Sequence, residues 1–147
     1  MEENTKMFGP HLMLDLYGCK KERLVDLDLV YNALDELPGL LNMHKIMPPY
    51  VIPYKGSADP HSFDKGGISG VVIIAESHIG IHTFVEQRFA SIDIFSCKNF
   101  EPKFAVEYFD KLFEPESYDK NFVMRGREFP REIMRVRQLV KKDRTKF

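Results

Sequence analysis

Apolar and polar residues alternate near the start of the chain, and the same alternation returns in its middle. In residues 11–17 leucine occupies positions 12, 14 and 16, and this period of two predicts a half-buried strand. Residues 79–84 and Phe89–Ser96 alternate in the same way, and the short polar turn at 86–88 predicts that they form a hairpin. Residues 68–75 have β-branched side chains at their centre, which is typical of a buried strand.

Two other segments show the spacing of amphipathic helices. Apolar residues recur at helical spacing between positions 27 and 34, and Asp26 before them is a suitable N-cap. We expect this helix to stop at Pro38, which is followed by glycine. Pro102–Phe113 carries a second apolar stripe behind a proline that suits the first turn of a helix. A third helix is predicted to begin at Pro130.

The order of these elements predicts the fold class. Residues 44–54 are expected to form an irregular strand, because their prolines cannot donate to a ladder, and residues 118–124 a last strand. Residues 55–67 are rich in Gly, Pro, Ser and Asp and are expected to form a loop. The pattern predicts a single α+β domain over residues 1–147. It would be a two-layer α/β sandwich with a mainly antiparallel sheet and helices on one face.

Composition and charge narrow the class of protein. The chain is 44% hydrophobic and 29% charged, with 12 Phe and 6 Tyr, which excludes disorder as a description of the whole chain. Its apolar runs are far shorter than the roughly 20 residues that cross a bilayer, and we see no secretory signal, so we expect no membrane partner. A formal net charge of −1 predicts no general attraction to nucleic acid. Two cysteines are too few for a disulfide scaffold, and a cytoplasmic location is expected.

Four polar residues of the middle segment could meet if its strands pair. The first begins a strand, the second follows the end of that strand, the third lies on the next strand, and the fourth ends the strand after. They are Ser69, Ser77, His82 and Cys97. Hydroxyl, imidazole and thiol groups in one place can supply a nucleophile, a base and an acid. Taken singly, each of these residues could also have a purely structural role, as a turn residue, as a residue on the polar face of a strand or as a buried residue at the end of a strand.

A metal site is the alternative convergence in this segment. Its candidate ligands would be His78, His82, Glu86 and Cys97. The two histidines are four positions apart, a spacing that suits a helix, whereas the local pattern is that of a turn and a strand. We therefore interpret His78 as a turn residue and expect no metal.

A longer string in this segment resembles a known family. Residues 75–84 read AESHIGIHTF, Glu86 follows, and residues 93–97 read DIFSC. The combination is similar to the prokaryotic S-adenosylmethionine decarboxylase proenzyme family. Segments 11–19 and 67–70 resemble the same family.

The resemblance implies a self-processing, pyruvoyl-dependent enzyme. The chain would break between Glu76 and Ser77, leaving a β chain of residues 1–76 and an α chain of residues 77–147. The Ser77 hydroxyl would attack the Glu76 carbonyl to form an ester, which would be eliminated to dehydroalanine and hydrolysed to a pyruvoyl group. That group would form a Schiff base with S-adenosylmethionine and take up the electrons left when CO₂ departs. The product would be the aminopropyl donor for spermidine synthesis.

The resemblance also implies a role for individual residues. Ser69 would assist the acyl shift, and His82 would be the base that removes the α-proton of the cleavage-site serine. Cys97 would protonate the product, because a thiol keeps its proton at neutral pH. Glu86 would bind the substrate ribose, and Phe63 would stack on adenine.

One stretch departs from the family's pattern. Val85 stands where the family commonly has proline, and residues 87–89 are Gln-Arg-Phe where a turn containing Tyr or Gly is more usual. These differences leave open a pyruvoyl-dependent decarboxylase of ornithine or arginine on the same scaffold. A non-catalytic α+β interaction module is the alternative outside enzymes. The resemblance further implies a homo-oligomer, a dimer of αβ units, with S-adenosylmethionine as its small-molecule partner.

Overall fold

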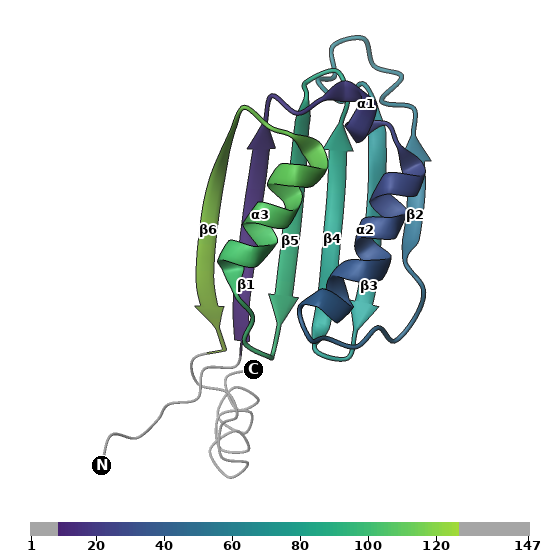
Figure 1. Ribbon diagram of the computed structural model, residues 1–147. Coiled ribbons are helices and arrows are strands. Elements are labelled where there is room, and N and C mark those ends of the chain that lie inside the picture. Colours follow the sequence, from purple (N-terminus) through teal and green to yellow (C-terminus); the bar gives the residue numbers. More distant parts are fainter. Residues whose placement is uncertain (1–8, 127–147) are drawn as a thin grey trace, which may run out of the picture.

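The structure is a computed structural model that describes residues 9–126, and one six-stranded sheet dominates it (Figure 1). In chain order the strands are β1 (Gly9–Tyr17), β2 (Tyr50–Tyr54), β3 (Gly67–Ile74), β4 (Ser77–Phe84), β5 (Phe89–Ser96) and β6 (Ser117–Arg125). They lie side by side in the order β2-β3-β4-β5-β1-β6, and each neighbouring pair is antiparallel. The prediction of a mainly antiparallel sheet is therefore confirmed.

Helices cover one face of this sheet (Figure 1). Within the described residues they are α1 (Lys21–Leu24), α2 (Leu27–Leu40) and α3 (Pro102–Phe113). The predicted cap of α2 is present, because the Leu29 N–H donates to Asp26 Oδ1 at 3.1 Å. The α+β class is confirmed, while the helix predicted from Pro130 lies outside the described residues. No helix in the described part of the chain is long and apolar enough to cross a membrane.

The predicted end of α2 at Pro38 is wrong, because the helix continues to Leu40. A proline this close to the C-terminus of a helix removes only one intrahelical hydrogen bond. Pro38 is buried, and its carbonyl accepts a hydrogen bond from the Met43 N–H at 2.8 Å. Packing and this backbone bond offset the loss, so the proline is tolerated inside the last turn.

The strand expected at 44–54 is shorter in the structure. Regular pairing is limited to Tyr50–Tyr54, and Lys45 makes only an isolated bridge with Ile74. The proline pair at 48–49 lies between the two and cannot donate to a ladder, which explains the interruption.

The core lies between the sheet and the helices. Alternate residues of each central strand point into it, as Leu12, Leu14 and Leu16 do on β1. Full burial of a side chain of this size contributes about 1.5–3 kcal/mol to stability. Gly70 allows α2 to approach β3 closely, because a Cβ at this position would lie 2.7 Å from Leu34 Cδ1.

The opposite face of the sheet carries no helix among the described residues, and we call it the open face. It is formed by the odd-numbered residues of β1, β3, β5 and β6 and the even-numbered residues of β2 and β4. Several large exposed side chains lie on it: Tyr17, Tyr50, Ile52, Tyr54 and Ile73. Large apolar side chains exposed on one face are typical of an interaction surface.

Candidate active site

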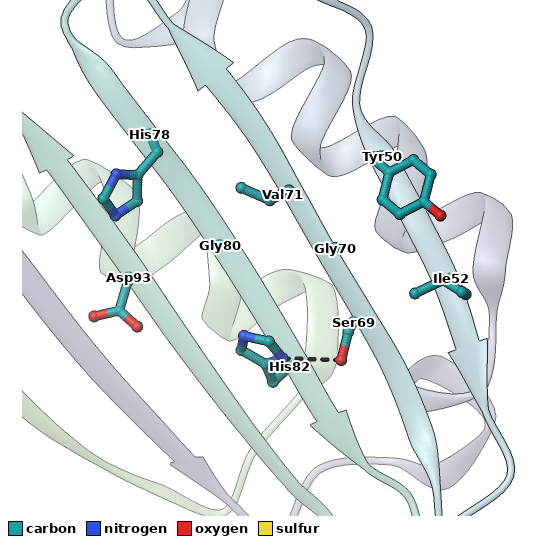
Figure 2. A pocket seen from close by; sticks show the side chains of 9 residues that line it. All are labelled: Tyr50, Ile52, Ser69, Gly70, Val71, His78, Gly80, His82 and Asp93. Carbon is teal, nitrogen blue, oxygen red and sulfur yellow. Dashed lines mark hydrogen bonds between the residues drawn. The ribbon is translucent and has the colours of Figure 1, made fainter.

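Ser69 and His82 face each other across the hairpin formed by β3 and β4. The register pairs their Cα atoms, and Ser69 Oγ lies 2.9 Å from His82 Nδ1 on the open face (Figure 2). The structure thus brings together two of the four predicted residues as a hydroxyl–imidazole pair.

The other two predicted residues meet at the opposite end of the hairpin. Ser77 is the first residue of β4 and pairs with Ser96, which immediately precedes Cys97. The Cys97 N–H donates a hydrogen bond to the Glu76 carbonyl oxygen at 2.9 Å. The carbonyl of the predicted cleavage bond therefore already has a backbone donor. Cys97 is exposed, so its alternative interpretation as a buried cysteine is wrong.

The Glu76–Ser77 peptide bond lies in a tight two-residue connection between β3 and β4. Ser77 has a φ of 155°, a value that non-glycine residues rarely adopt. Backbone conformations of this kind cost about 1–3 kcal/mol and are concentrated at functional sites. The Ala75 N–H donates to the His44 carbonyl at 2.8 Å, which holds the connection from the side opposite Cys97.

The Glu76 side chain is anchored by a residue that the sequence did not indicate. Its carboxylate accepts hydrogen bonds from the backbone N–H of His44 at 3.2 Å and from His44 Nδ1 at 3.0 Å. These bonds lower the pKa of Glu76, with the imidazole bond as the larger cause. Glu76 is 12% exposed and His44 78% exposed, so the acidic side chain is held inward by a histidine at the surface.

His78 also belongs to this end of the hairpin. Its Nδ1 lies 3.3 Å from Ser77 Oγ, and its ring stands edge-on to Phe95 with centroids 5.9 Å apart. In the structure His78 is part of β4, so its interpretation as a turn residue is wrong. As the second residue of β4, His78 lies directly beside the predicted nucleophile.

The two clusters do not meet within one chain. Ser77 and His82 lie five positions apart on β4, which corresponds to about 17 Å along an extended strand. Neither side chain is long enough to span that distance. The convergence expected from the sequence is thus replaced by a cleavage end, which holds Glu76, Ser77 and Cys97, and a histidine end, which holds Ser69 and His82.

The predicted substrate-binding residues lie beyond the histidine end. Glu86 follows β4 in the turn to β5, and its carboxylate lies 3.5 Å from Lys21 Nζ. Phe63 is 74% exposed, with its ring 6.3 Å from that of Phe84. An apolar hollow of about 260 Å³ is lined by Tyr17, Phe63, Phe84, Gln87 and Phe89. Both predicted residues are therefore remote from Ser77 in the same chain.

Val85 makes a contact that proline could not make. Its backbone N–H donates to the Gly66 carbonyl oxygen at 3.1 Å. The departure from the family's pattern therefore adds a hydrogen bond between the β4–β5 turn and the loop that precedes β3.

A second hollow, of about 360 Å³, lies on the open face between the two ends (Figure 2). Gly80 forms part of its floor, and a Cβ there would meet nothing closer than the Gly70 oxygen at 3.9 Å. His78 and His82 flank Gly80 about 13 Å apart along the strand, too far to bind one metal ion. Among residues 9–126 no group of three or more His, Cys, Asp and Glu could hold a metal.

Comparison with known proteins settles the relationship of this chain. A family described as S-adenosylmethionine decarboxylase matches residues 10–126. The chain belongs to the S-adenosylmethionine decarboxylase family. This match includes both ends of the hairpin and the helices that support it.

Individual relatives agree with the family assignment. An S-adenosylmethionine decarboxylase proenzyme of Thermodesulfovibrio yellowstonii is 39% identical over 107 residues, 72% of each chain. A proenzyme of the same name from Geobacillus kaustophilus is 30% identical over 131 residues, 89% of this chain and 97% of the relative. The crystal structure of the Aquifex aeolicus adenosylmethionine decarboxylase matches with a TM-score of 0.67 at 27% identity, covering 82% of this chain and 92% of the other.

Proposed function

We propose that this protein is a carboxy-lyase that decarboxylates S-adenosylmethionine with a pyruvoyl group made from its own Ser77. The observation that carries the proposal is the cleavage bond itself: Ser77 has a strained φ of 155°, and the Glu76 carbonyl accepts a hydrogen bond from the Cys97 N–H. Membership in the family and the word proenzyme in the names of its relatives support self-processing. The alternative substrates ornithine and arginine are not favoured, because the relatives are named for S-adenosylmethionine.

The first step is attack of Ser77 Oγ on the Glu76 carbonyl carbon, which moves the acyl group from nitrogen to oxygen. Negative charge develops on the Glu76 carbonyl oxygen, where the Cys97 N–H already lies at 2.9 Å. A donor placed at such an oxygen contributes about 10²–10³-fold to the rate. The anchored Glu76 side chain keeps the carbonyl in place, since His44 holds its carboxylate through two hydrogen bonds.

The second step, elimination of the ester, needs a base at the α-proton of Ser77. His82 is the family-matched base, and about 17 Å of strand separates it from Ser77 in its own chain. We therefore propose that the His82 of a second copy performs this step, with Ser69 holding its Nδ1. The protein would then act as a homodimer in which neither chain has a complete site alone.

If two copies pack symmetrically with their open faces together, the His82 of each copy can reach the Ser77 of the other. A two-fold axis between the sheets, crossing β4 near Gly80, would lay each histidine end over the cleavage end of the partner. The hollow at Gly80 leaves room at the axis, and the exposed apolar side chains of the open face would be buried. Glu86 and Phe63 would reach the partner's Ser77 by the same operation.

The pyruvoyl group, once formed, supplies an electron-withdrawing carbonyl that accepts the electrons left when CO₂ departs. The cleavage end fits a pyruvoyl group, because this group would form from Ser77 itself and needs no other residue to bind it. Cys97 follows β5 directly beside Ser77, and its exposed thiol would donate the proton to the product. Glu86 would bind the substrate ribose and Phe63 would stack on its adenine. A cytoplasmic location stays a prediction.

The intact mass of the purified protein tests the proposal. We expect two chains that correspond to residues 1–76 and 77–147, the second blocked at its N-terminus, and release of CO₂ from carboxyl-labelled S-adenosylmethionine. An uncut chain without a reactive carbonyl would contradict self-processing. Cleavage with CO₂ release from ornithine or arginine alone would contradict the substrate.

A further inference from the structure

The nearest base to the nucleophile is one that the resemblance does not assign. Ser77 Oγ lies 3.3 Å from His78 Nδ1, and among residues 9–126 no other side chain is within hydrogen-bond distance of this hydroxyl. We propose that His78 accepts the Ser77 hydroxyl proton in the first step of self-cleavage. The inference rests on the proposed function and adds a catalytic residue to it.

Neighbouring candidates for this role are occupied or out of reach. His44 uses its Nδ1 to hold the Glu76 carboxylate, which is thereby engaged as well. His82 is about 17 Å away along β4 and is paired with Ser69. His78 thus has the only imidazole in the described chain that contacts the reacting oxygen.

The position of the His78 ring is fixed by its neighbours. It lies on the open face of β4, with Ile73 opposite it on β3 and Phe95 opposite it on β5. The ring is edge-on to Phe95, at an interplanar angle of 61°. Cross-strand contacts of this type restrict a side chain and hold its nitrogen toward Ser77.

The step is balanced without any further reactant. The Oγ proton moves to Nδ1 of a neutral imidazole, while the bond from Oγ to the Glu76 carbonyl carbon forms. The bond from that carbon to the Ser77 nitrogen then breaks, and the imidazolium returns its proton to the leaving nitrogen. The products are an ester, a free amine and a neutral His78, so nothing is oxidised or reduced.

This assignment divides self-cleavage between two histidines. His78 of the same chain would act before the ester exists, and His82 of the partner would act after it has formed. Hydroxylamine cleaves esters and leaves ordinary peptide bonds intact, so it distinguishes the two roles. A chain arrested before the ester stays whole in hydroxylamine, whereas a chain arrested after it is split.

The experiment follows the full chain made by cell-free translation with a pulse of labelled methionine. His78→Ala and His78→Asn are compared with the wild type and with His61→Ala, which removes an exposed loop histidine outside the site. General bases contribute about 10²–10⁴-fold, so we expect both His78 variants to cleave at least tenfold more slowly and to resist hydroxylamine. His61→Ala should cleave at the wild-type rate.

Two results would overturn the inference. One is cleavage of either folded His78 variant at the wild-type rate. The other is slow cleavage with a chain that hydroxylamine splits, which would move His78 to the elimination step. Circular dichroism checks folding. If His78→Ala does not fold, the result with His78→Asn, whose side-chain volume is closer to the original, is used instead. A wild-type chain that never cleaves would instead contradict the proposed function itself.

Discussion

The two ends of the hairpin formed by β3 and β4 are made from the same pair of strands, yet we propose that they serve different reactions. The cleavage end holds a strained serine, a carbonyl with a backbone donor and an anchored glutamate. The histidine end holds an imidazole paired with a hydroxyl at 2.9 Å, and neither Ser69 nor His82 has a positive φ. Both ends have an imidazole beside a hydroxyl, but only the cleavage end has the peptide bond to be broken, and extended β-structure keeps the two ends apart.

The contrast explains why the proposed active site needs two copies of the chain. A strand cannot fold back on itself, so residues five positions apart on β4 stay about 17 Å apart whatever their side chains are. In the proposed isologous dimer the two ends would be exchanged, and one set of residues would complete two sites.

The largest effect is expected for substitution of Ser77, the proposed nucleophile of the cleavage end. Ser77→Ala removes Oγ, so we expect no cleavage at all and a single chain of 147 residues by intact mass. Ser96→Ala, a nearby serine paired with Ser77 across the strands, is the matched control and should still be cleaved. Splitting of the Ser77→Ala chain would assign the attack to another residue.

The next largest effect is expected for a substitution on the open face that prevents two copies from packing together. Val71→Glu places a charge in the middle of the open face, beside the hollow at Gly80, where a single chain has room for it. We expect light scattering to report a monomer and cleavage to slow by at least tenfold, because burial of an unpaired charge between the two sheets is costly. Val25→Glu, at a 62% exposed position in the helical layer, should leave both measurements unchanged. A monomer of Val71→Glu that cleaves at the wild-type rate would contradict a site completed by two copies.

A narrower prediction separates the two proposed roles of Cys97, its backbone N–H in cleavage and its thiol in turnover. Cys97→Ala keeps the backbone N–H that bonds the Glu76 carbonyl, so cleavage should proceed. Loss of the thiol should lower turnover about 10²-fold or more and allow protonation at the wrong atom, which converts the N-terminal pyruvoyl group to alanine. Full turnover in this variant, measured as CO₂ release, would show that the proton comes from elsewhere.

The smallest effect contrasts the two cysteines. Burial raises the pKa of Cys19 to about 11, so its reactive thiolate is scarce below that pH, whereas Cys97 is exposed. In the folded Ser77→Ala chain we expect iodoacetamide at neutral pH to modify one thiol, and both after unfolding. Modification of Cys19 in the folded protein, located by mass spectrometry, would show that this end of β1 opens.

Much of the fold could be predicted from the sequence, because alternation and helical spacing are local signals. The bounds of α3 and β5, and the capping of α2 by Asp26, follow directly from residue pattern. Pro38 was misinterpreted because its tolerance depends on burial, which no local pattern records. The isolated bridge that brings His44 to Glu76 spans about 30 residues and likewise leaves no local trace.

The site was predictable by residue type and only partly by position. The expectation that Ser77 lies in a loop allowed it to fold toward His82, whereas the structure starts β4 at Ser77 and makes the separation unavoidable. Sequence spacing alone could have indicated His78, since it is adjacent to the nucleophile, but its assignment to a turn gave it no fixed direction. The position at which β4 begins therefore determines which residues meet, and the sequence pattern did not show that position.

Complementation between two inactive chains tests most directly whether two copies of the chain complete each site. His82→Ala chains carrying a tag are co-produced with Ser77→Ala chains, and tag capture verifies that mixed dimers form. We predict that His82→Ala chains are cleaved in the mixture, because the partner supplies His82, and that they stay uncleaved with a Ser77→Ala/His82→Ala partner. Verified mixed dimers in which no His82→Ala chain is cleaved would contradict a site completed by two copies.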